Sequence, residues 1–148
     1  MQKVLLADLS IILVEPSDTQ RKIISALLHK EDVKNVNAVS NVKEAIEAIN
    51  KQGADLVVSS MYLEDGMGLD ILTSIKNSPE HCAIPFMLVS SESRAEKLEE
   101  FKQAGVAAML PKPFSTENLS RALKASLDLI NTEELDLNLF DVRQVRVL

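Results

Sequence analysis

Short apolar runs alternate strictly with longer segments of helical period along this chain, in five successive pairs. The clearest apolar runs are 11–14, 56–58 and 85–89. Continuous apolar runs of this length, bounded by turn residues, are typical of strands that are buried on both faces. Parallel strands need crossover connections, which helices supply. The alternation therefore predicts a parallel sheet with helices on both faces.

Two weaker runs, 36–39 and 106–110, complete the five predicted strands, and a loop is predicted at 64–68. Five pairs in 148 residues favour an open sheet over an eight-stranded barrel. Right-handed crossovers then favour an α/β, flavodoxin-like (βα)5 doubly wound parallel sheet with strand order 2-1-3-4-5. Polar residues suited to cap a helix precede three of the helical segments. They are Ser17 or Asp18, Ser40 or Asn41, and Ser115 or Thr116.

Composition and charge exclude several classes of function. The length suits one domain with a short extension, and the formal net charge is −6. Binding to nucleic-acid phosphates needs a basic face, and an aromatic content of 3% offers no stacking platform for bases. No apolar stretch has the length of a membrane span, and the first residues do not read as a secretory leader. We therefore expect a cytoplasmic protein that binds neither nucleic acid nor membranes.

Polar residues follow the apolar runs at the points where the predicted strands end. In open parallel sheets the carboxyl ends of the strands share one edge, where ligands bind. We expect four strand ends to meet there. They are Glu15-Pro16, 59–62, Ser90-Ser91 and Pro111-Lys112.

The same strand ends carry markers that resemble those of bacterial response-regulator receiver domains, the phosphoacceptor domains of two-component phosphorelay signalling. The resemblance covers about residues 10–130. No single marker is specific, but all of them occur in register at the correct spacings. The markers are Leu13-Val14-Glu15-Pro16 with Arg21, 55–60, Gly68-Leu69-Asp70, Ile84-Pro85, 89–91, 104–106 and 112–114.

In an active receiver, an aspartate at the end of the third strand accepts a phosphoryl group from a histidine kinase. Two acidic residues after the first strand help to hold Mg²⁺, while a Ser or Thr and a Lys contact the phosphoryl oxygens. The resemblance places Ser60 at the phosphoacceptor position, and Glu15 and Pro16 at the acidic pair. The phosphoryl-contact positions are Ser90 and Lys112, and Met109 occupies the position of an aromatic switch residue.

These substitutions predict a pseudo-receiver that lacks the phosphoacceptor aspartate. A serine forms a phosphoester and not the labile acyl phosphate that an aspartate forms. With Ser60 and Pro16 neutral, Glu15 alone is a poor Mg²⁺ site. We therefore expect no bound metal, no cofactor, no catalytic residue and no enzymatic activity. We also expect Lys112 to turn to Glu15 or to stay solvated. The sequence leaves the isomer of the Lys112–Pro113 bond open.

A phosphorylation-independent protein-interaction module is the leading hypothesis for function. In receivers, the fourth helix with the fifth strand and the fifth helix is the usual docking surface. We expect the partner surface to be either this face or the region around Ser60, and a homodimer through the helical face is one expectation. Other expected partners are a second receiver domain in the same chain, a sensor kinase or an effector. The alternative function is a small flavodoxin-like enzyme or a nucleotide- or flavin-binding protein. A further alternative is an active receiver that uses Asp65 as a displaced acceptor.

Residues 131–148 form a C-terminal extension or linker. Leu135, Leu137 and Leu139 alternate there with polar residues, which predicts an extended conformation. The last residues, 145–148, resemble the opening of a receiver's first strand. We therefore expect a piece of a longer protein in which a second receiver follows. The alternative is a native tail that packs on its own domain or swaps to a partner.

Overall fold

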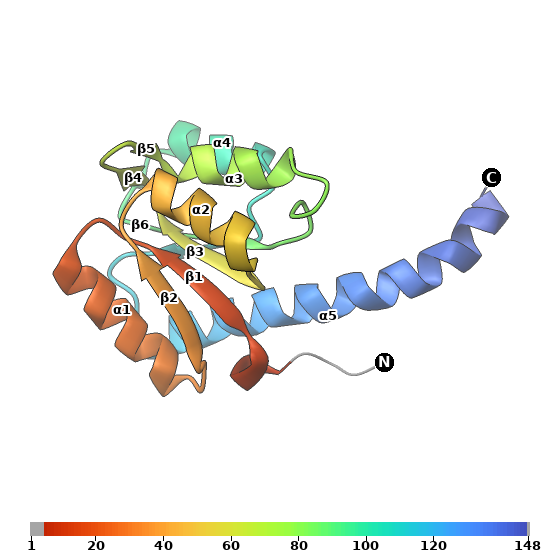
Figure 1. The fold of residues 1–148 in the computed structure, drawn as a ribbon, viewed down its shortest axis with the longest axis horizontal. Helices are drawn as coiled ribbons and strands as arrows, with labels where there is room; N and C mark the ends of the chain where they lie inside the picture. Colours follow the sequence, from red (N-terminus) through yellow and green to blue (C-terminus); the bar gives the residue numbers. More distant parts are fainter. Residues whose placement is uncertain (1–4, 148) are drawn as a thin grey trace.

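The computed structural model describes residues 5–147, with side chains described as far as Asn131. Helices and strands alternate along the chain as predicted (Figure 1). The elements are η1 (Leu6–Asp8), β1 (Ser10–Val14), α1 (Asp18–Lys30), β2 (Asn35–Val39), α2 (Val42–Gln52), β3 (Leu56–Ser60), β4 (Tyr62–Leu63), β5 (Gly66–Met67), α3 (Gly68–Lys76), β6 (Phe86–Ser90), α4 (Ala95–Gln103), β7 (Ala108–Pro111) and α5 (Thr116–Val147).

Five parallel strands form the main sheet in the order β2-β1-β3-β6-β7. Strands β4 and β5 pair only with each other, as an antiparallel hairpin that begins two residues before the predicted loop 64–68. When the hairpin is set aside, the order of the main strands is 2-1-3-4-5. The predicted flavodoxin-like α/β fold is confirmed.

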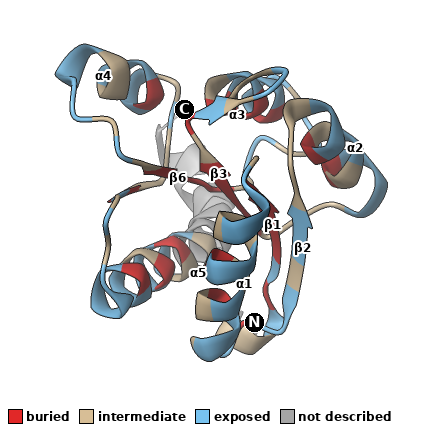
Figure 2. Cartoon of the chain, turned by 90° about the vertical axis from the view of Figure 1, so that its left-hand side faces the viewer, coloured by how far each residue is buried: buried red, intermediate tan, exposed pale blue. Residues whose placement is uncertain are grey.

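The sheet separates two apolar cores (Figure 2), because successive side chains of a strand point to opposite faces. Ile11 and Leu13 of β1 pack in the core that contains buried residues of α1 and α5. Ile12 and Val14 pack in the core that contains buried residues of α2, α3 and α4. The strands are therefore apolar on both sides, which explains why they appear in the sequence as continuous runs.

Side chains from the predicted cap positions begin three helices. The Ser17 hydroxyl accepts a hydrogen bond from the Gln20 amide at 3.2 Å, at the start of α1. Asn41 accepts from the Glu44 amide at 2.8 Å before α2, and Ser115 accepts from the Asn118 amide at 3.1 Å before α5. Each bond satisfies an amide that has no partner inside the helix.

The C-terminal extension differs from its prediction. Helix α5 continues as far as Val147, so the extended conformation predicted for Leu135 to Leu139 is wrong, as is the strand-like opening predicted at 145–147. Residue 148 lies outside the described residues. Residues 132–147 contain neither Gly nor Pro, and each residue added to an existing helix gains a backbone hydrogen bond without a new nucleation cost. Across the residues that the structure describes, no helix is both long and apolar enough to cross a membrane.

Candidate functional site

Polar side chains from three strand ends meet at the carboxyl edge of the main sheet. Glu15 directly follows β1, Ser60 ends β3 and Lys112 directly follows β7. The Ser60 hydroxyl donates a hydrogen bond to Oε1 of Glu15 at 2.6 Å, and Nζ of Lys112 lies 3.3 Å from the same oxygen. We call these residues the Glu15–Ser60–Lys112 cluster. It forms because β1 is a neighbour of β3, and β3 is joined to β7 through β6.

Glu15 is the centre of this cluster, and its side chain is only 5% exposed. Its second oxygen, Oε2, accepts a hydrogen bond from the Ser17 amide at 2.8 Å. Burial raises the pKa of Glu15, but hydrogen bonds from Ser60 and the Ser17 amide, together with the charge of Lys112, lower it by more. The pKa of Glu15 therefore lies below its ordinary value of 4.5, and the carboxylate is ionised at neutral pH.

The second position of the acidic pair contributes no side-chain oxygen, because it is Pro16. The backbone there is held by Arg21 of α1, which donates to the carbonyl oxygens of Glu15 at 2.8 Å and Pro16 at 3.3 Å. Arg21 also forms an ion pair with Asp18. The loop after β1 is thus ordered by an arginine that contacts backbone oxygens.

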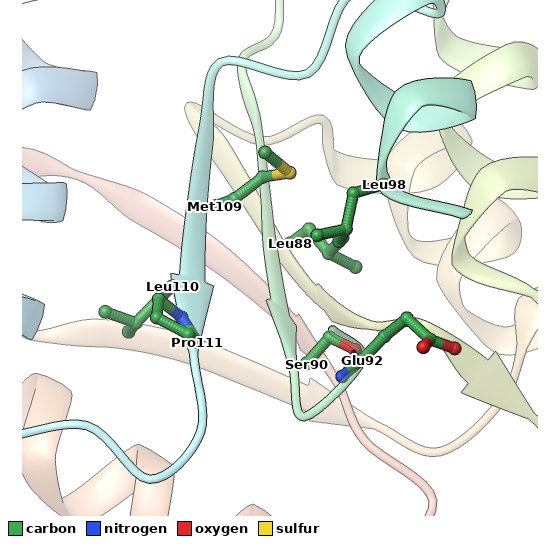
Figure 3. A pocket seen from close by; sticks show the side chains of 7 residues that line it. All are labelled: Leu88, Ser90, Glu92, Leu98, Met109, Leu110 and Pro111. Carbon is green, nitrogen blue, oxygen red and sulfur yellow. Dashed lines mark hydrogen bonds between the residues drawn. The ribbon is translucent and has the colours of Figure 1, made fainter. Parts of the chain in front are cut away.

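Ser90 and Met109 lie on the next two strands and line one pocket. The pocket has a volume of about 220 Å³ between β6, β7 and α4 (Figure 3). Met109 lies half-buried in its wall, and the Ser90 hydroxyl accepts a hydrogen bond from the Glu92 amide at 3.0 Å. The Lys112 amide donates to the Ser90 carbonyl oxygen at 2.9 Å, and the Lys112–Pro113 peptide bond is cis. The pocket is mainly apolar, and its lining residues are Leu88, Ser90, Glu92, Leu98, Met109, Leu110 and Pro111.

The donor set at the strand ends does not suit Mg²⁺, the metal that the receiver resemblance implies. Mg²⁺ is bound through carboxylate, phosphate and water oxygens in octahedral geometry. Glu15 is the only carboxylate of the Glu15–Ser60–Lys112 cluster, and Lys112 contacts one of its oxygens. Within the described part of the chain, no group of three or more His, Cys, Asp or Glu residues is arranged to hold a metal ion.

Asp65, the candidate for a displaced acceptor, lies in the turn between β4 and β5. Its carboxylate accepts hydrogen bonds from the Val42 amide at 2.8 Å and the Lys43 amide at 3.0 Å. The bond from the Val42 amide, followed by that from Lys43, lowers the pKa of Asp65. The contacts observed for Asp65 thus tie the hairpin to the first turn of α2.

One polar group beside the site was not predicted from the sequence. Tyr62, Glu92 and Arg94 are joined by hydrogen bonds between the segment after β3 and the loop after β6. Glu92 follows Ser90 by two residues, and Tyr62 follows Ser60 by two residues. That matching offset past two neighbouring strands is the sequence signal that could have indicated the contact.

Replacing Glu15 by Gln is expected to destabilise the fold by about 1–2 kcal/mol at neutral pH, because Lys112 loses its charged partner while remaining in contact with water. The folded-state pKa of Glu15 is lowered, so the contribution of its charge is complete above pH 4.5 and is lost as the pH falls through the folded pKa. The stability difference between wild type and Glu15→Gln should therefore shrink below pH 4.5. Urea unfolding at a series of pH values measures this difference.

Lys112→Met supplies the matched control, because it removes the cation and keeps an unbranched apolar stem. When Lys112 is already Met, Glu15→Gln should lower the free energy of unfolding at neutral pH by less than it does in the wild type. A double-mutant cycle measures this difference. A stability difference that stays constant with pH would contradict the assigned ion pair.

Comparisons with known proteins show the family of this chain. The family model of the response regulator receiver domain matches residues 11–124. The chain is 27% identical over 123 residues to chemotaxis protein CheY-3 of Vibrio cholerae serotype O1, an alignment that covers 83% of this chain and 95% of that protein. It is 23% identical to chemotaxis protein CheY of Pseudomonas aeruginosa, over 83% of this chain and 99% of that protein.

Solved structures share the fold. The chemotaxis response regulator CheY4 of Vibrio cholerae superposes with a TM-score of 0.73 at 22% identity, over 79% of this chain and 97% of that one. The signal receiver domain of a signal transduction histidine kinase from Syntrophus aciditrophicus gives a TM-score of 0.74 at 23% identity, over 80% and 89% of the two chains. With a family model that spans most of its length and a sheet of the same topology, this chain belongs to the response regulator receiver domains, the CheY-like domains of two-component signalling.

Proposed function

We propose that this receiver domain works without phosphorylation at its strand-end site and acts as a protein-interaction module in bacterial two-component signal transduction. The Glu15–Ser60–Lys112 cluster carries the proposal. The single carboxylate of the acidic pocket already accepts hydrogen bonds from the Ser60 hydroxyl, the Ser17 amide and Lys112. Internal partners therefore occupy the groups that an active receiver offers to a metal ion and a phosphoryl group.

The chemistry of Ser60 supports the same conclusion. Phosphorylation of a hydroxyl forms an ester, whereas an aspartate forms a mixed anhydride whose hydrolysis ends a signal quickly. The neutral Ser60 hydroxyl also adds no charge to attract Mg²⁺, which in phosphoryl transfer bridges the phosphate oxygens and offsets their charge. Lys112 is already paired with Glu15, so a phosphoryl group at Ser60 would compete with an existing ion pair.

The partner surface in this proposal is the face made by α4, β7 and α5, with the pocket beside Met109 at its edge (Figure 3). Apolar pockets with a few polar groups at one end are suited to an apolar side chain of a protein partner. That partner is a second receiver, a sensor kinase, an effector or a second copy of this chain. A net charge of −6 disfavours nucleic acid and anionic membranes as partners. No observation at the strand ends favours the flavin- or nucleotide-binding alternative.

Incubation with radiolabelled acetyl phosphate and millimolar Mg²⁺ tests the proposal. We expect no acid-labile phosphate on this chain, because the chain offers neither an aspartate at position 60 nor a carboxylate pair for the metal. A receiver with all three acidic residues, treated in parallel, shows that the reagent is active. If the protein becomes labelled and the label maps to a residue within 10–130, phosphorylation independence is overturned.

A further inference from the structure

The Glu92 carboxylate is the most heavily hydrogen-bonded side chain beside the site. It accepts from Nε of Arg94 at 3.0 Å and from Nη2 of Arg94 at 2.8 Å, which is the two-pronged geometry of a guanidinium on a carboxylate. It also accepts from the backbone amides of Ser93 at 3.1 Å and Arg94 at 3.0 Å, and from the Tyr62 hydroxyl at 3.0 Å. With these donors around it, the Glu92 side chain is only 10% exposed although it lies in a loop.

Only one of these donors comes from another part of the chain. Ser93 and Arg94 belong to the same loop as Glu92, whereas Tyr62 begins β4, thirty residues earlier. The bond from Tyr62 therefore joins the segment after β3 to the loop after β6. Glu92 also reaches the strand end itself, because its amide donates to the Ser90 hydroxyl at 3.0 Å. In Figure 3 Glu92 lies beside Ser90 at one end of the pocket, with its carboxylate directed away from Met109.

Helix α4 depends on this loop for its position. Its single fully buried residue is Phe101, near the C-terminal end, whereas Ala95 and Glu96 in its first turn are exposed. The N-cap residue, Arg94, makes no side-chain cap hydrogen bond to the helix. A segment with so little buried apolar surface opens more readily than the sheet does. Leu98 packs partly buried against the core one turn into the helix. Before Leu98, the hydrogen bonding around Glu92 is what joins the start of α4 to the rest of the domain.

We propose that Tyr62, Glu92 and Arg94 form a latch that holds the β6–α4 loop and the start of α4 in one conformation without phosphorylation. This inference deepens the proposed function and rests on it, since a docking face that is not switched by a phosphoryl group needs another means to be kept in place. Arg94 and Glu92 order the loop within itself. Tyr62 then fixes the ordered loop to the segment that follows Ser60.

Hydrogen exchange of the full chain, followed by mass spectrometry, tests the latch with Tyr62→Phe. This variant keeps the ring and removes the one hydroxyl that crosses between the two segments. We expect exchange of the amides in 91–98 to accelerate by about threefold to tenfold, with no change in β1, β3 and β6. Glu92→Gln keeps an acceptor for the Tyr62 hydroxyl but loses the charge paired with Arg94, and it should also accelerate exchange in 91–98.

Glu117→Gln is the matched control. Glu117 also pairs with an arginine, Arg121 at 2.7 Å, but on the exposed surface of α5. This variant should leave exchange in 91–98 at the wild-type rate. Tyr62 is the only tyrosine and the chain has no tryptophan, so its fluorescence gives a second measurement. A carboxylate that accepts from the phenol quenches this emission, and Glu92→Gln should therefore brighten it.

Unchanged exchange in 91–98 for Tyr62→Phe would overturn the latch, as would an acceleration spread evenly over the sheet, which would indicate a loss of global stability only. Either result is distinct from a failure of the proposed function. Acetyl-phosphate labelling of the wild type overturns phosphorylation independence whatever the exchange rates are. Absence of label together with unchanged exchange leaves phosphorylation independence supported and removes the latch alone.

Discussion

The double variant Pro16→Asp/Ser60→Asp is expected to bind Mg²⁺ and to become labelled by acetyl phosphate, in contrast to the wild type. It would place three carboxylates at the strand ends, since Glu15 is already there. The Ser60 hydroxyl lies 2.6 Å from Oε1 of Glu15, so a carboxylate at position 60 must lie against that of Glu15. Mg²⁺ converts this repulsion into coordination, because carboxylate oxygens are its preferred protein ligands.

Without Mg²⁺, the double variant should be less stable than the wild type. Carboxylates this close cannot all ionise at their ordinary pKa values, and Lys112 supplies a single positive charge against them. Added Mg²⁺ should raise the stability by about 1 kcal/mol when its concentration is about five times its Kd. Thermal unfolding with and without Mg²⁺ measures this shift in stability. The radioactivity that stays with the protein after incubation with labelled acetyl phosphate measures phosphorylation.

The neutral pair Pro16→Asn/Ser60→Asn provides the control, since its side chains have nearly the same shape and no charge. It should show neither the Mg²⁺ shift nor the label. If Pro16→Asp/Ser60→Asp also shows no Mg²⁺ shift and no label, the missing carboxylates are not what prevents phosphorylation. Another feature at the strand ends must then be responsible. The latch formed by Tyr62, Glu92 and Arg94 would then be the first feature to remove.

The fold is predictable from the sequence because its strands are buried on both faces. Residues 11–14 are apolar without interruption, and the structure places Ile11 and Leu13 in one core and Ile12 and Val14 in the other. Such a run has no alternating pattern, which indicates a central parallel strand. Helix caps such as Ser17 and Asn41 were equally predictable from the sequence, because short polar side chains accept hydrogen bonds from the first amides of a helix.

The meeting of Glu15, Ser60 and Lys112 was also predictable, since the order of parallel strands determines which strand ends are neighbours. The contact between Tyr62 and Glu92 was predictable only in part. Their matching offset past two neighbouring strands indicates that the two residues lie close together. The hydrogen bond itself depends on the rotamers of both side chains, which neither propensity nor periodicity describes. The helical course of 131–147 was missed for a different reason: alternating leucines suggest a strand, but continuing an existing helix outweighs that local pattern.

Gly68→Ala is expected to be among the most damaging single substitutions near the site. A Cβ at position 68 would lie 2.4 Å from the carbonyl oxygen of Ser60 and 3.1 Å from the Ser59 hydroxyl. The first of these neighbours is backbone of a central strand, held in register with Val89, and it cannot move independently. Replacing Gly by Ala favours a helix by up to about 1 kcal/mol, but the clash should cost more and leave a net loss of about 2–4 kcal/mol.

Gly53→Ala separates this steric effect from backbone strain. Gly53 ends α2 with a φ of 71°, and nothing lies within 4 Å of its added Cβ. Its substitution should cost about 1–3 kcal/mol from backbone strain alone, because φ 71° with ψ −176° is a conformation that essentially only glycine adopts. Urea unfolding of both variants should place Gly68→Ala below Gly53→Ala in stability. An equal loss would mean that α3 shifts away from β3 easily, and the close approach of Gly68 to Ser60 would then not be what positions the strand end.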